Sequence, residues 1–253
     1  MNIYPDNNII IDIENGKYTK QELLSAIGLN QGKIFFSSVH LTEADEMRSK
    51  DKDFRIAARC RTISSITSNN YIEFNLDTHK SKKQVVAPSE ILKRHKFWSN
   101  NTTSGELQKK ELGDVTQEQR IGFRESLGID PMEINNYTAK DVLEQYEKNK
   151  DKFENKSLSE LINSASLLKL KRPASQLAKI VTTFEFLDMI GFWKDIYTEK
   201  SDFARAQDAQ HCNAASVCDI FISNDRRTRN KARVVFEIYG IKTKVIDSKG
   251  IES

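Results

Sequence analysis

Residues 207–225, QDAQHCNAASVCDIFISND, join a helical pattern directly to a short apolar run. In the helical part, Asp208 shares one face mainly with small side chains, so this helix can pack closely against a sheet. Residues 220–222 have the length and the branched or aromatic content of a buried strand, which stops at Ser223. Because ligands of open α/β sheets bind at the carboxyl ends of strands, Asp208 and Asp225 are expected to converge on one crevice.

The N-terminal region predicts the same order of elements. Residues 2–5 predict a strand, and Asp6 follows it immediately. Asn7 or Asn8 can then cap a helix. This places a further carboxylate at the carboxyl end of a strand.

The next segment adds a second strand and a further acidic residue. Residues 33–36 predict a strand, and a helix starting at residue 39 carries Glu43 in its early turns. Helical character continues through residues 53–66, and residues 70–76 alternate as one further strand at a sheet edge.

The middle of the chain, residues 77–194, is polar and rich in Lys, Glu, Asn and Ser. It contains several helical patterns, of which residues 157–168 and 173–193 carry enough apolar side chains at helical spacing to pack. We find no strand pattern there. This region is therefore expected to form a helical insertion or subdomain between core segments at about residues 1–76 and 195–253.

The alternating pattern resumes after this insertion. The helix with Asp208 and the strand at residues 220–222 are followed by a helix at residues 228–240 and a final strand at residues 241–246. Alternating strands and helices predict an α/β fold with a mainly parallel central sheet sandwiched between helices.

Composition excludes several classes of protein. The chain has 253 residues and 38% hydrophobic content, enough for a globular core, and its formal net charge of +3 permits a nucleic-acid partner without requiring one. Three cysteines without a CxxC pair indicate neither a disulfide framework nor a zinc ribbon. There is no membrane-spanning stretch or secretory leader pattern, so we expect a cytoplasmic protein.

Three segments together resemble a PIN-domain nuclease: IYPDNNIIIDIENG, FFSSVHLTEA and DAQHCNAASVCDIFISNDRRTRNKARVVFEIYGIKTKV. The resemblance covers roughly residues 1–50 and 200–250, and its strongest element is the closing Asp-x-x-His…Asp-x-x-x-Ser-x-Asp run. It implies a three-layer α/β/α PIN-like fold and hydrolysis of phosphodiester bonds, most often in RNA. Asn7 and Pro5 depart from the family's usual residues, but neither position is a metal ligand.

The resemblance also implies a set of site residues. The four acidic positions match Asp6, Glu43, Asp208 and Asp225, and the supporting positions match Asn8, Asp219 and Ser223. Glu46, one turn after Glu43, is the alternative to it. Taken singly, an aspartate next to a strand is more often a helix cap than a ligand, whereas four in family order favour a site.

The chemistry of such a site requires a cation. Clustered carboxylates repel a phosphodiester unless they hold Mg²⁺ or Mn²⁺, which are hard cations that prefer oxygen ligands. Two such ions can activate water and stabilise the leaving oxygen. His211, like His40, is expected to be a packed, hydrogen-bonded residue rather than a ligand.

Basic residues follow Asp225 directly: Arg226, Arg227, Arg229, Lys231 and Arg233. They form either a solvated helix face or a contact surface for phosphates. A second basic group contains Lys169, Lys171 and Arg172 in the insertion.

The function expected from these features is a metal-dependent endoribonuclease, acting as a toxin-like or defence effector and regulated by a protein inhibitor or partner. The alternatives are a structure-specific DNA nuclease of the flap-endonuclease type and a catalytically inactive PIN-like module that binds RNA or protein. The sequence does not indicate an oligomeric state.

Overall fold

The structure is a computed structural model that describes residues 1–45, 49–75, 78, 80–99, 117–130, 133–165, 175–194 and 199–251. The chain divides into two compact units. The first unit contains Met1–Thr102, His211–Arg229 and Lys242–Ser253, and the second contains Thr103–Gln210 and Asn230–Ile241. This division differs from the predicted one, because residues 77–102 belong with the first unit, whereas residues 195–210 and 230–241 belong with the second.

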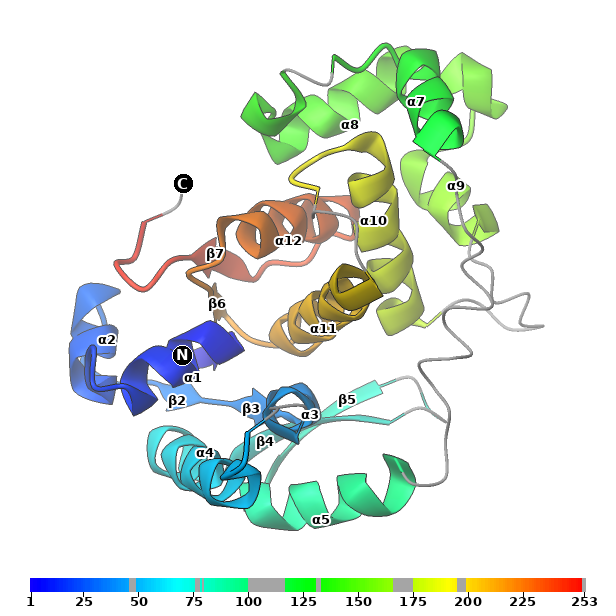
Figure 1. Cartoon of the computed structure of the whole chain (residues 1–253). Helices are drawn as coiled ribbons and strands as arrows, with labels where there is room; N and C mark the ends of the chain where they lie inside the picture. The colour runs from blue at the N-terminus through cyan, green and yellow to red at the C-terminus, as the bar shows by residue number, and fades with distance from the viewer. Residues whose placement is uncertain are drawn as a thin grey trace. The chain divides into compact units, whose positions relative to one another are not determined.

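A four-stranded parallel sheet forms the centre of the first unit (Figure 1). Its strand order is β2-β1-β6-β7, with bounds β2 (Lys33–Ile34), β1 (Asn2–Pro5), β6 (Ile220–Ile222) and β7 (Lys244–Ile246). The buried residues of these strands are mostly apolar, as expected where both faces of a parallel sheet are covered. Pro5 pairs with Ile222 in register, so Asp6 and Ser223 follow their strands at the same edge. The mainly parallel sheet that the sequence predicted is confirmed.

A second sheet in this unit has the order β3-β4-β5, with bounds β3 (Phe36–Ser37), β4 (Asn70–Asn75) and β5 (Lys80–Val85). Strand β4 runs parallel to β3 and antiparallel to β5. The expectation that β4 lies at an edge is therefore wrong. The expectation of no strand within residues 77–194 is also wrong. Strand β5 escaped sequence analysis because it is Lys-rich, mostly exposed and without an alternating apolar pattern.

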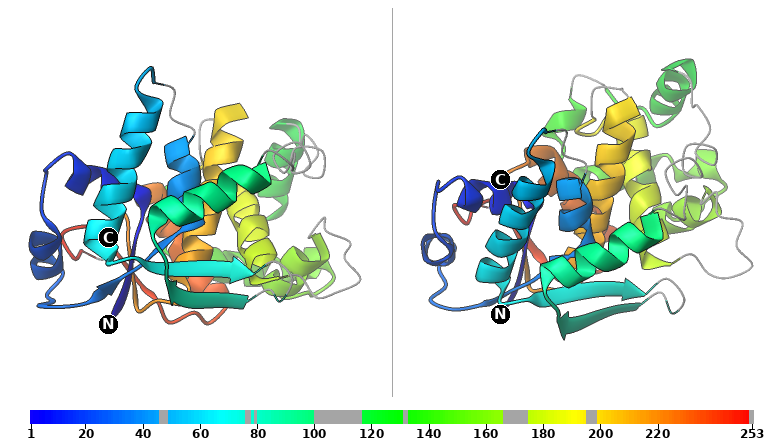
Figure 2. Two further views of the ribbon diagram at one scale, coloured as in Figure 1. Left: turned by 90° about the horizontal axis from the view of Figure 1, so that it is seen from below. Right: turned by 60° about the horizontal axis from the view of Figure 1, so that its bottom comes forward.

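The helices of the first unit surround these sheets. Their bounds are α1 (Asn7–Glu14), α2 (Lys20–Ala26), α3 (Ser38–Asp45), α4 (Lys52–Thr67) and α5 (Pro88–Ser99). Helices α3, α4 and α5 pack against one another beside the β4-β5 hairpin (Figure 2). A core of buried aliphatic side chains, including Ile3, Ile10 and Ile63, joins helices and strands. The three cysteines are buried free thiols.

In the residues described, the second unit is entirely helical. Its elements are α7 (Gln117–Ser126), η1 (Ile134–Asn136), α8 (Ala139–Lys148), η2 (Lys150–Phe153), α9 (Leu158–Ala165), α10 (Gln176–Ile190), most of α11 (Glu199–Ala215) and the later part of α12 (Arg226–Ile238). Its own core includes Leu127, Tyr146 and Leu187. Across the described parts of both units, none of the helices combines the length and apolar character needed to span a bilayer.

Candidate functional site

Asp6 ends strand β1 and begins helix α1, which fixes its position at the sheet edge. Its backbone N–H donates to the carbonyl of Ile222 at 2.7 Å, and its side chain is the N-cap of α1. The cap is therefore one residue before Asn7 and two before Asn8, the two predicted caps. Asp6 Oδ1 accepts from the backbone N–H of Asn7 at 2.6 Å, so the aspartate that ends the strand also orients the helix.

The second carboxylate oxygen of Asp6 is held by the two predicted supporting residues. Asn8 Nδ2 and Ser223 Oγ each donate to Asp6 Oδ2 at 2.6 Å. Burial raises the pKa of Asp6 above its ordinary value, and the negative charge of Glu43 raises it further, while His211 and the hydrogen bonds oppose this. The site therefore disfavours the charge on Asp6 despite its three hydrogen bonds.

Glu43 reaches the same place from helix α3. His211 Nε2 lies 2.9 Å from Glu43 Oε1 and 3.6 Å from Asp6 Oδ1, so the imidazole joins the two carboxylates. The other oxygen, Glu43 Oε2, accepts a hydrogen bond from Asn7 Nδ2. Two carboxylates 37 positions apart in the sequence therefore meet at one buried histidine.

Asp225 lies at the predicted strand end, but its side chain serves the next helix. It is exposed, and its Oδ1 accepts from the backbone N–H groups of Arg227 at 2.7 Å and Thr228 at 3.4 Å, which caps α12. Its own backbone N–H donates to Ser223 Oγ at 3.1 Å. Ser223 thus contacts both strand ends.

Two of the other predicted acidic residues lie on α11 and beside β6. Asp208 lies on α11 one turn before His211, in the stretch that belongs to the second unit. Asp219 lies just before β6, where its Oδ2 accepts from the backbone N–H of Asn2 at 2.6 Å. Its side chain is therefore at the end of the strand opposite Ser223. Glu46 lies outside the described residues.

The basic residues of α12 do not form one exposed surface. Arg226 and Arg227 are exposed, whereas Arg229 is buried and donates through Nη1 to the carbonyl of Ser223 at 2.7 Å. Lys231 is also buried, and Arg233 is half-buried. The prediction that Arg229 contacts a nucleic acid is wrong, because its guanidinium supports the end of β6. Lys169, Lys171 and Arg172 lie outside the described residues.

The carboxylate pair has the donor chemistry of a magnesium or manganese site. Mg²⁺ is commonly held by one or two carboxylates, with water and substrate phosphate oxygens completing its coordination, and Asp6 and Glu43 supply two. Burial is the largest cause of the raised pKa of Asp6 and the charge of Glu43 adds to it, so a cation bound beside them would favour the ionised carboxylate. Among the described residues, no group of three or more His, Cys, Asp or Glu side chains is arranged to hold a metal ion. In the part of the chain that the structure describes, two carboxylates would thus coordinate the metal ion, and water or substrate oxygens would supply the other ligands.

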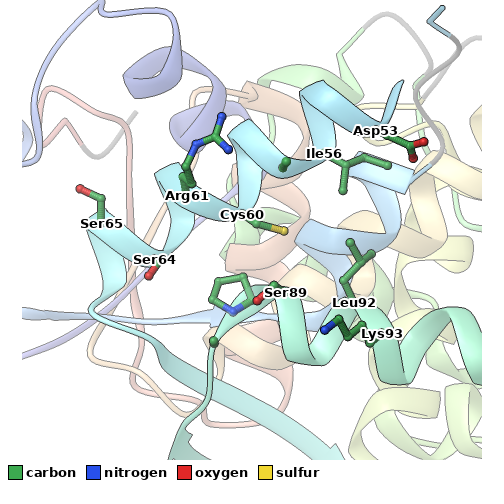
Figure 3. A pocket seen from close by; sticks show the side chains of 12 residues that line it. Asp53, Ile56, Cys60, Arg61, Ser64, Ser65, Ser89, Leu92 and Lys93 are labelled. Atoms are coloured by element: carbon green, nitrogen blue, oxygen red, sulfur yellow. The ribbon is translucent and has the colours of Figure 1, made fainter. Parts of the chain in front are cut away.

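A pocket of about 730 Å³ lies elsewhere in the first unit, between α4 and α5. Ile56 and Cys60 line it from α4, Leu92 lines it from α5, and Arg61 and Lys93 lie at its rim (Figure 3). None of the predicted site residues is among those that line it. We place the candidate site at Asp6, Glu43 and His211, where charged groups converge, rather than in this open groove between α4 and α5.

His211 is the site residue that sequence reasoning left out. It is fully buried on α11, and Tyr4 OH lies 2.9 Å from its Nδ1. Asn7, treated only as a departure from the family pattern, also belongs to the site. It donates to Glu43, and its Oδ1 accepts from Arg59 Nη1 at 2.9 Å. Comparisons of the chain with protein-family models, with curated proteins and with solved structures found no match.

Proposed function

We propose that this protein is a divalent-metal-dependent nuclease that hydrolyses RNA phosphodiester bonds. The observation that carries the proposal is the meeting of Asp6 and Glu43 at the carboxyl edge of a parallel sheet, where ligands of α/β proteins bind. Burying two carboxylates together is costly unless a cation offsets their charge. The raised pKa of Asp6 reflects that cost.

In this proposal Asp6 and Glu43 hold the cation, and Asn8 and Ser223 keep the Asp6 carboxylate in place. The bound cation supplies Lewis-acid activation of water and neutralises charge on the phosphate. Asp208 and Asp225 remain proposed contributors from the family resemblance. If Asp225 takes part, it does so while capping α12.

RNA is the proposed substrate, and its backbone is proposed to contact the start of α12. Arg226 and Arg227 are exposed there, at the end of a helix whose free N–H groups and dipole favour anions. Such contacts bind phosphate without reading sequence. Binding is therefore expected to weaken steeply as salt concentration rises.

The test compares Asp6→Asn with Asp219→Asn, since both aspartates flank neighbouring strands but lie at opposite ends of the sheet. Single-stranded RNA and branched DNA are incubated with each folded variant in Mn²⁺, with and without chelator. We expect RNA cleavage by the parent, a loss of about a thousandfold or more in Asp6→Asn, and near-parental rates in Asp219→Asn. Equal cleavage rates in the parent and Asp6→Asn would refute the proposal. Faster cleavage of branched DNA than of RNA would instead identify DNA as the substrate.

A catalytically inactive RNA-binding module is the second candidate. It is favoured by the hydrogen bonds that already engage both oxygens of Asp6, and by the lack of a three-ligand group among the described side chains. This candidate predicts RNA binding that chelator does not change, together with no cleavage in Mn²⁺. The same incubations therefore separate the two functions.

A further inference from the structure

A chain of buried hydrogen bonds runs from strand β3 to Glu43. Ser37 Oγ lies 2.6 Å from Tyr4 OH, Tyr4 OH lies 2.9 Å from His211 Nδ1, and His211 Nε2 lies 2.9 Å from Glu43 Oε1. Ser37, Tyr4 and His211 are each at most 5% exposed. The chain therefore connects the carboxylate with the interior of the first unit.

The direction of the bond to Glu43 follows from its carboxylate. An ionised carboxylate only accepts, so His211 donates from Nε2 to Glu43. Nδ1 shares the next hydrogen bond with the Tyr4 hydroxyl, which shares a further one with the Ser37 hydroxyl. Burial raises the pKa of Tyr4 well above its ordinary value, which keeps this phenol a donor.

His40 provides an internal comparison in the same unit. Its Nδ1 accepts from the backbone N–H of Ser37 at 3.2 Å, so its proton also resides on Nε2, 3.0 Å from the carbonyl of Pro5. Burial lowers the pKa of His40 well below its ordinary value, so it is neutral. Both buried histidines therefore donate from Nε2, but the bond from His211 ends on a carboxylate whereas the bond from His40 ends on a backbone carbonyl.

Glu43 is also held from its other side. Asn7 Nδ2 donates to Glu43 Oε2, and Asn7 is itself held by Arg59, which pairs with Glu14. A glutamate side chain is otherwise free to adopt many rotamers, and fixing it costs conformational entropy. The hydrogen bonds from His211 and Asn7 already restrict the Glu43 side chain, so less conformational entropy is lost when a ligand binds.

We infer that His211 is a positioning residue: its Nε2–H, oriented by Tyr4 and Ser37, fixes the Glu43 carboxylate beside Asp6 as one half of a divalent-cation site. This inference rests on the proposed function for the identity of the ligand. It assigns no substrate contact to His211, which is fully buried. Residues that orient metal-binding carboxylates affect metal affinity although they do not touch the metal.

The first experiment measures Mn²⁺ affinity by calorimetry in the parent, His211→Ala and His211→Gln. Glutamine keeps an N–H near the position of Nε2, whereas alanine removes the donor. We expect affinity about 10- to 100-fold weaker in His211→Ala and near-parental affinity in His211→Gln. Parental affinity in His211→Ala, or equal losses in both variants, would overturn the inference.

Tyr4→Phe tests the orienting step without touching the imidazole. The matched control is Thr243→Val, which also removes a buried hydroxyl, one that donates to the carbonyls of Ala215 and Cys218 in the same unit. We expect weaker Mn²⁺ binding in Tyr4→Phe and unchanged binding in Thr243→Val. An equal change in both variants would point to general loosening and count against the inference.

A second readout does not depend on metal or activity. Nitrogen-15 NMR of the imidazoles is expected to place the His211 proton on Nε2, and Glu43→Gln is expected to shift that signal while Asp219→Asn leaves it in place. A His211 Nε2 without a proton would overturn the inference even in an active nuclease. If the parent binds no Mn²⁺ and cuts no RNA, the proposed function fails, and the NMR signal still decides whether His211 holds Glu43.

Discussion

Each unit of the protein contains a buried cluster of charged side chains, and the two clusters differ in their balance of charge. In the second unit, Arg205 lies 2.8 Å from Glu185 and 3.7 Å from Asp188, and Lys231 lies 3.6 Å from Asp188. Among the side chains described, two cations there face two carboxylates. This composition is that of a structural ion cluster holding α10, α11 and α12 together.

The cluster of the first unit has an excess of negative charge among the side chains described. Asp6 and Glu43 meet at His211, while the Arg59 guanidinium pairs with Glu14 and reaches Glu43 only through Asn7. Burial is the largest cause of the raised pKa of Asp6, Glu43 adds to it and His211 opposes it. A cation bound beside the two carboxylates, as in the proposed function, would favour the ionised form of Asp6.

The largest effect is expected from unbalancing the cluster of the second unit. Arg205→Met removes a cation whose side chain is 2% exposed and leaves buried carboxylates without it, which should lower the free energy of unfolding by about 3–5 kcal/mol. Chemical denaturation measures this change. Replacing all four charged residues with apolar ones should recover most of the loss, because the desolvation cost then disappears as well.

Lys140→Met is the matched control within the same unit. Lys140 also forms an ion pair, at 3.4 Å from Glu144, but its side chain is 83% exposed. Exposed pairs contribute little, so we expect a change of at most about 1 kcal/mol. If Arg205→Met changed the free energy of unfolding as little as Lys140→Met, the balance of buried charge could not be what distinguishes the two clusters.

The comparison also shows which parts of the molecule can be predicted from the sequence. The pattern strand, aspartate, helix placed Asp6 correctly at a sheet edge, because each step is local. Likewise, the helix that follows β3 carried Glu43 into the site. Strand β5 has no local apolar pattern and forms because it pairs with all six residues of β4.

Long-range contacts explain most of what the sequence did not predict. His211 contacts Glu43 and Tyr4, which lie 168 and 207 positions away in the chain, so no local spacing indicated its role. Arg229 was placed correctly on a helix, but helical spacing does not reveal which face the rest of the fold covers. Asp219 was placed correctly before its strand, but nothing in the sequence indicated that its side chain accepts from the backbone N–H of Asn2, 217 positions away.

The second prediction concerns pH and the excess charge on Asp6. Its pKa in the folded protein is raised above the unfolded value of about 3.9, so the folded state binds this proton more tightly. The contribution of Asp6 to stability therefore falls as pH rises from that value through the raised pKa. We expect the free energy of unfolding of Asp6→Asn, relative to that of the parent, to increase as pH rises. Denaturation at several pH values measures this difference.

A constant difference between parent and Asp6→Asn across this pH range would show that the first cluster is as well compensated as the second. Saturating Mn²⁺ sharpens the same measurement. The cation should stabilise the parent, by about 2.7 kcal/mol at a hundred times its dissociation constant, and should leave Asp6→Asn nearly unchanged.

The smallest effect is expected at Asp225. Two substitutions there distinguish a side chain that only caps a helix from one that also helps to bind a cation. Asp225→Asn keeps an oxygen that can accept from the backbone N–H of Arg227, whereas Asp225→Ala removes it. If the side chain acts only as a cap, Asp225→Ala should lose about 1 kcal/mol of stability and Asp225→Asn almost none, with parental Mn²⁺ affinity in both. If it also contributes charge to the site, Mn²⁺ affinity should fall in both variants although Asp225→Asn stays stable. Because the side chain is exposed and already accepts two N–H groups, capping accounts for its position, and a loss of Mn²⁺ affinity in the stable Asp225→Asn variant is the result that would keep Asp225 among the proposed contributors.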